Sequence, residues 1–103
     1  MIKIDTTVII KNLKGEAFKD EDQNDLTLGK TISMCLSTSQ QGGKMKSFLL
    51  AQKFYESDSV EVDIADFGIV KQAVETYQHS NNLVLGQALV LLDAAKDASE
   101  PKK

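Results

Sequence analysis

VEVDIADF, residues 60–67, joins a short β-strand pattern to the strongest helix start in the sequence. Asp63 has the position of an N-cap, and Asp66 stands three residues later, in a variant of the capping box. Val62 and Phe67 have the spacing of a hydrophobic staple, in which two apolar side chains fix how the chain enters the helix. A strand that runs directly into a capped helix predicts a fold with both kinds of element.

Four helices are predicted from apolar residues that recur with helical spacing. Thr27 is expected to cap the first of them. Gly68 weakens the third by about 1 kcal/mol relative to alanine, and close packing against a neighbour would explain its presence. The predicted helices cover residues 28–36, 44–55, 64–77 and 83–95.

The second predicted helix has an apolar stripe that we expect to face the core. Aromatic residues at helical spacing belong to a core more often than to a base-stacking platform, and no arginine accompanies them. The stripe consists of Met45, Phe48, Leu49 and Gln52, broadened by Phe54 and Tyr55.

The first ten residues alternate with the period of a strand that buries one face. A turn is predicted over residues 12–15, and residues 16–19 return as a second short strand. Because an isolated hairpin is marginally stable in water, helices must cover its apolar face. The predicted fold is therefore α+β, an N-terminal β-hairpin packed on about four short α-helices, mostly helical. The buried face is expected to hold Ile2, Ile4, Thr6, Val8 and Ile10.

Length and charge narrow the class of protein. The 103 residues predict one globular domain over 1–98 and a frayed tail over 99–103. The net charge is −3, and all 12 basic residues are lysines scattered among carboxylates, which argues against nucleic-acid binding. With no signal-peptide pattern and no run of about 18 apolar residues, a cytoplasmic location without a membrane segment is expected.

An acidic segment partly matches a calcium-binding loop. Asp20, Asp22 and Asn24 fit the first half of the pattern. Asp25 and Thr31 stand where the loop requires glycine and a bidentate glutamate. We therefore expect a solvated acidic loop, with weak cation association as the alternative.

Two further patterns resemble catalytic or nucleotide-binding motifs and are incomplete. Gly29-Lys30-Thr31 lacks the glycine that a phosphate-binding loop has five residues earlier, so Gly29 is expected to belong to a helix start. Cys35 and His79 are the only cysteine and histidine, too few for a zinc site. A buried Cys35 and an exposed His79 are expected, with a Cys–His pair as the alternative. We predict no catalytic residue, metal site or cofactor.

The helix over 83–95 is apolar on nearly every side, which is typical of a central helix or an interface. Core packing and a protein interface are equally compatible with this pattern. A charged residue at Leu89 or Leu92 would yield a monomer if the helix is an interface, and an unfolded chain if it is core. The interface residues predicted here are Val84, Leu85, Leu89 and Leu92.

The order of a hairpin start, DLTLGK (25–30), VEVDIAD (60–66) and LVLGQAL (83–89) resembles small, largely uncharacterised proteins of tailed bacteriophages and prophages. The resemblance implies a protein that acts by binding in the bacterial cytoplasm, in virion assembly or host takeover. We therefore expect a non-enzymatic protein that self-associates or binds a protein partner. The alternative is a regulator that binds nucleic acid or a transcription complex.

Overall fold

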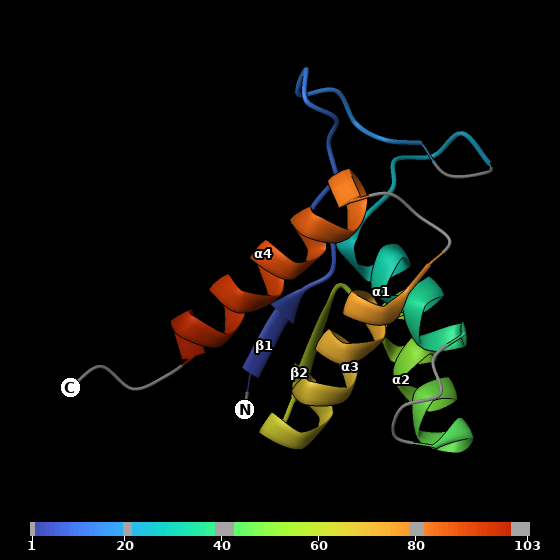
Figure 1. Ribbon diagram of the computed structural model, residues 1–103, viewed down its shortest axis with the longest axis vertical. Coiled ribbons are helices and arrows are strands. Elements are labelled where there is room, and N and C mark those ends of the chain that lie inside the picture. The colour runs from blue at the N-terminus through green and yellow to red at the C-terminus, as the bar shows by residue number, and fades with distance from the viewer. Residues whose placement is uncertain (1, 20–21, 39–42, 79–81, 100–103) are drawn as a thin grey trace.

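The computed structural model describes residues 2–19, 22–38, 43–78 and 82–99. It confirms the predicted class, because the described chain is mostly helical and contains one small antiparallel sheet. In chain order the elements are β1 (Ile2–Asp5), α1 (Leu28–Thr38), α2 (Lys44–Glu56), β2 (Ser59–Val62), α3 (Ile64–Thr76) and α4 (Asn82–Ser99) (Figure 1).

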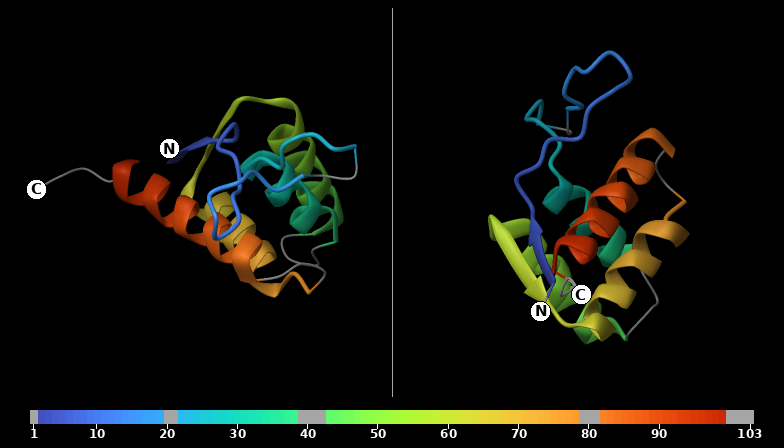
Figure 2. Two further views of the ribbon diagram at one scale, coloured as in Figure 1. Left: turned by 90° about the horizontal axis from the view of Figure 1, so that it is seen from above. Right: turned by 90° about the vertical axis from the view of Figure 1, so that its left-hand side faces the viewer.

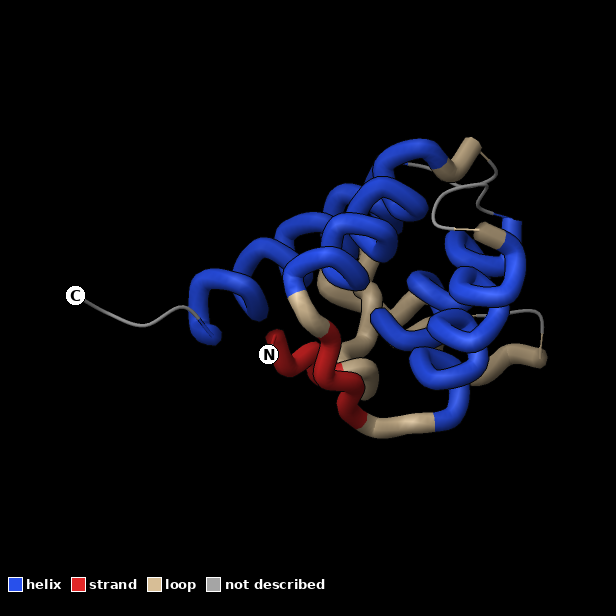
Figure 3. The backbone as a smooth tube through the Cα atoms, turned by 90° about the horizontal axis from the view of Figure 1, so that it is seen from below, coloured by secondary structure: helices blue, strands red, loops and turns tan. Residues whose placement is uncertain are grey.

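The sheet consists of β1 and β2, with Ile2 opposite Val62 and Ile4 opposite Val60. In both strands buried and exposed residues alternate, so all four of these apolar side chains lie in the core. Figure 3 shows the two strands at one edge of the helical part of the molecule. The predicted alternation of the N-terminal segment is confirmed as far as Ile10, which is fully buried.

The predicted N-terminal turn and return are also present. The Phe18 amide donates to the Ile10 carbonyl at 2.9 Å, the backbone of Lys11 bridges that of Ala17, and Gly15 has a φ of 85°. This hairpin projects from one end of the molecule (Figures 1 and 2). The hairpin is paired through isolated bridges, whereas the regular ladder of the described chain is formed by β1 and β2.

The first residues do not pair with residues 16–19 as predicted. Instead, β1 pairs with β2, which comes from the middle of the chain. Thr6 separates the ladder from the hairpin. Its amide donates to the Asp58 carbonyl at 3.0 Å, and its hydroxyl donates to the Ser57 carbonyl. Because these bonds tie Thr6 to the segment that follows α2, the strand up to Asp5 runs beside β2.

α1 is the central helix and packs against α2, α3 and α4. The Lys30 amide donates to the Thr27 hydroxyl at 3.2 Å, which confirms Thr27 as the cap. The predicted stripe of α1 is buried. It consists of Leu28, Ile32, Cys35 and Leu36.

α3 begins as its sequence predicts. The Asp63 carboxylate accepts from the Asp66 amide at 2.7 Å, and Val62 and Phe67 both lie in the main core. Gly68 differs from the prediction, because it is exposed and a Cβ built on it would meet no atom within 4 Å. Close packing therefore does not explain this glycine.

Gly68→Ala is expected to stabilise the protein by about 0.5–1 kcal/mol, because alanine loses less backbone entropy than glycine in a helix. The measurement is the free energy of unfolding from urea denaturation. A decrease in that free energy would contradict the open surroundings of the site.

The C-terminal helix is longer than predicted and includes Ser99, the first residue of the predicted tail. Residues 100–103 lie outside the described chain. Among the described helices, none has the length and apolarity needed to cross a bilayer.

Candidate interaction surface

The interface residues predicted on α4 lie largely inside the protein. Val84, Leu85 and Leu92 are buried, and Leu89 is half-buried against the main core. α4 contacts β1, α1 and α3, and these contacts bury most of its apolar side chains, while Val90 is 68% exposed. Core packing therefore accounts for these side chains.

An open groove of about 740 Å³ runs between the N-terminal segment and α4. Gln87 lies in its wall, where its side chain accepts from the Lys11 amide at 3.0 Å and donates to the Lys11 carbonyl. The same amide group donates to the Leu83 carbonyl at 2.9 Å, which fixes its orientation. Gln87 thus attaches the hairpin to α4.

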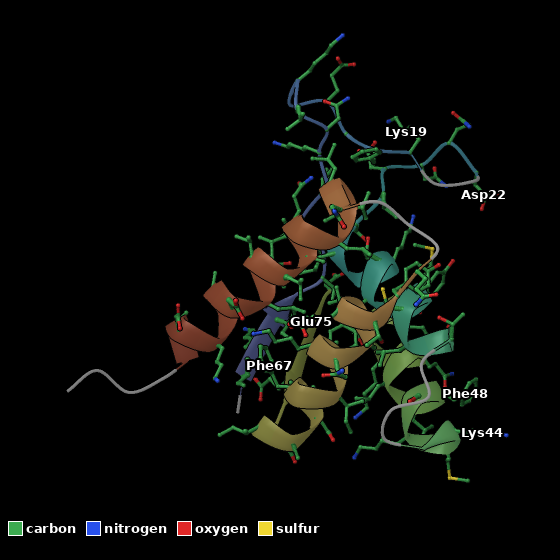
Figure 4. The ribbon with its side chains drawn as sticks, viewed as in Figure 1. Lys19, Asp22, Lys44, Phe48, Phe67 and Glu75 are labelled. Atoms are coloured by element: carbon green, nitrogen blue, oxygen red, sulfur yellow. The ribbon has the colours of Figure 1, made fainter. Side chains whose placement is uncertain are left out.

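α2 buries the side of the helix opposite to the stripe of Met45, Phe48 and Leu49 that was predicted to face the core. Its buried side consists of Ser47, Leu50, Ala51 and Phe54. Of the predicted stripe, Phe54 is buried as expected, whereas four other residues are exposed: Met45 is 76%, Phe48 64%, Leu49 48% and Tyr55 66% exposed. We call these last four residues the α2 patch. Figure 4 shows Phe48 pointing away from the rest of the molecule.

The buried side of α2 includes two small residues, Ser47 and Ala51. The Ser33 hydroxyl of α1 donates to the Ala51 carbonyl at 2.9 Å, and Ser47 is also buried. Ala51 therefore lies against α1, on a buried side that Ser47 shares with Leu50 and Phe54, while Met45, Phe48 and Leu49 face outward. Both sides of α2 contain apolar residues, so periodicity alone identifies neither as buried. The signal that sequence reasoning missed is the spacing of Ser47 and Ala51.

The α2 patch continues into a second groove through Tyr55. This groove has a volume of about 770 Å³ and lies between α1, the end of α2 and the segment before α1. Met34 of α1 is partly exposed in its wall, and Lys30 lies nearby in the same wall. The exposed apolar surface therefore extends from α2 onto α1.

The charge of α2 differs from that of the whole chain. α2 contains Lys44, Lys46 and Lys53, and its acidic residue is Glu56 at the last position. Lys46 pairs with Asp66 of α3 at 3.0 Å, which fixes one lysine against the body. In a chain of net charge −3, the α2 patch thus has a basic border.

Cys35 lies in the core, and the prediction of a buried cysteine is confirmed. Burial raises the pKa of its thiol to about 12, because a thiolate would lose its hydration there. A thiol with this pKa is a poor nucleophile at neutral pH. His79, which was expected to be exposed and would pair with Cys35 only in the alternative, lies outside the described residues.

Cys35 is expected to react with a disulfide reagent at pH 8 about a thousandfold more slowly in the folded chain than in the unfolded chain. Above pH 9 the unfolded thiol ionises while the folded one does not, so its contribution to stability falls as pH rises from 9.0 towards 12. Thiol titration with and without urea measures the rates. Equal rates would show that Cys35 is accessible.

The remaining sequence motifs form no described site. Asp20 and Glu21 of the acidic loop lie outside the described residues, while Asp25 pairs with Lys19. Within the described ranges, no three histidine, cysteine or carboxylate side chains come together as metal ligands. Gly29 is confirmed as a helix-start residue, the second of α1.

These features define an α+β, mostly helical domain with an exposed apolar helix face bordered by lysines. No family model matches the sequence, and neither a curated protein nor a solved structure is significantly similar to it.

Proposed function

We propose that this chain is a non-enzymatic protein-interaction protein and that it binds a protein, either a partner or a second copy, through the α2 patch. The exposed side of α2 is the observation that supports this proposal. With side-chain areas of about 150–250 Å² for large aromatic residues, the four residues expose on the order of 500 Å². The largest apolar patch on a typical monomer covers about 300–600 Å² and is often functional.

The non-enzymatic character and the biological role in this proposal are supported by different observations. The non-enzymatic part rests on the incomplete motifs of the sequence and on the poor nucleophilicity of the buried Cys35. The resemblance to small proteins of tailed bacteriophages is the basis for proposing that the binding serves virion assembly or host takeover.

Photo-crosslinking tests the α2 patch as a binding surface. In cells that naturally encode this chain, a benzophenone amino acid replaces either Phe48 or Leu13. Leu13 is 91% exposed and lies on the hairpin, so it is a matched control with a single exposed apolar side chain. We expect a protein adduct from position 48 and none from position 13.

Two outcomes would contradict the proposed function. Equal adduct yields at positions 48 and 13 would mean that any exposed apolar side chain reacts. An adduct at position 48 that nuclease treatment removes would mean that the surface binds nucleic acid.

A further inference from the structure

The border of the α2 patch restricts what can cover it. Lys44 precedes the patch, Lys53 lies near its far end, and both are exposed. Figure 4 shows that Lys44 points outward, like Phe48. Glu56 is held beside Gln52, whose amide lies 3.5 Å from its carboxylate. A binding partner therefore meets apolar side chains with Gln52 among them, two lysines at the edges and Glu56 at the C-terminal end, so the border is positive on balance.

A second copy is a poor match for this border. If two α2 helices faced each other, each apolar patch would be covered, but each copy would bring two exposed lysines, Lys44 and Lys53, and only one glutamate, Glu56, to one small interface. Like charges that face each other at an interface oppose association.

The size of the patch suits a single segment of a partner. Met45, Phe48 and Leu49 lie on neighbouring turns of α2, and Tyr55 follows two turns later at the groove beside Met34. One amphipathic helix covers such a stripe with residues three and four positions apart. The groove of about 770 Å³ provides room for a large side chain at one end of that helix.

We infer that the α2 patch binds a segment of another protein that is apolar on one face and carries aspartate or glutamate along its edges. Acidic side chains complement Lys44 and Lys53, and the apolar face covers Phe48 and its neighbours. This inference rests on the proposed function and adds the chemistry of the partner.

Mapping of the adduct tests this chemistry directly. The segment crosslinked to position 48 is sequenced by mass spectrometry. We expect a segment of a different protein in which apolar residues recur with helical spacing and acidic residues outnumber basic ones. A segment with net positive charge, or a peptide of this chain itself, would overturn the inference. No adduct at position 48 would instead overturn the proposed function.

Charge reversal tests the border. Lys44→Glu with Lys53→Glu is expected to lower the adduct yield at position 48 at least tenfold. The control, Lys11→Glu with Lys14→Glu, changes the net charge equally on the exposed hairpin and is expected to leave the yield unchanged. Circular dichroism confirms that both variants fold. An equal loss in both pairs would contradict local charge recognition.

Two other possible occupants of the α2 patch, a second copy of the chain and a membrane, are tested with the purified chain. Sedimentation up to millimolar concentration is expected to show a monomer, and co-sedimentation with phosphatidylserine vesicles is expected to recover none of it. A dimer that Phe48→Asp dissociates would show that a second copy covers the patch. Vesicle binding that Phe48→Asp abolishes would show that a membrane does. Either result would overturn the acidic partner segment.

Discussion

Leu92→Asp is expected to leave the chain without cooperative unfolding at 25 °C. Leu92 is fully buried in the main core, beside Leu85 and Ala88 of the same helix. An unpaired carboxylate there loses its hydration at a cost of several kcal/mol, and the whole free energy of unfolding of a small domain is only about 5–15 kcal/mol. Thermal and urea denaturation followed by circular dichroism measure the result.

Val90→Asp is the matched control for this variant. Val90 lies on the same helix two residues earlier and is 68% exposed. Its carboxylate stays hydrated, so we expect a change of less than about 0.5 kcal/mol, as for most surface substitutions. A folded, monomeric Leu92→Asp protein would contradict core packing of α4 and restore this helix as an interface.

Gly29→Ala is expected to lower the free energy of unfolding by about 3 kcal/mol, at the upper end for overpacked sites. A Cβ on Gly29 would lie 2.5 Å from the Phe54 carbonyl oxygen and 2.7 Å from Cβ of Thr6. The Gly29 amide also donates to the Thr6 carbonyl at 3.0 Å, so the two segments cannot separate without losing this bond. For a domain of this size, the midpoint of thermal unfolding would fall by about 15 °C.

Gly68→Ala provides the matched control, because it makes the same chemical change in a helix where the new methyl group meets nothing. The two variants are expected to shift the midpoint of thermal unfolding in opposite directions. If Gly29→Ala unfolded at the wild-type temperature, the close approach of α1, α2 and Thr6 would be wrong.

Several local features could be predicted because their physical causes are local. Asp63 and Asp66 form a cap through a bond between residues three positions apart. Thr27 caps α1 in the same way. The turn before Gly15 and the alternation of the first residues likewise depend on neighbours in sequence.

The candidate surface could not be predicted, and α2 shows why. Phe48 and Phe54 are both aromatic, yet Phe54 is buried and Phe48 is exposed. Hydrophobicity is equal for the two, so the difference comes from which side of the helix allows α1 to approach. On the buried side, the Ala51 carbonyl accepts a hydrogen bond from Ser33 of α1, a residue far away in the sequence. For the same reason, the partner of β1 was predicted as the adjacent segment and is instead β2.

The sequence by itself determined where helices start and which N-terminal residues turn inward, because capping bonds and strand alternation act over a few residues. Only the tertiary structure decided that α4 supplies core residues while α2 exposes its apolar side. An apolar side chain lowers the free energy equally well against any apolar neighbour, so its partner is fixed by the shapes of the segments that meet. The close contact of Gly29 with Thr6 and Phe54 is one such meeting, between segments far apart in the chain.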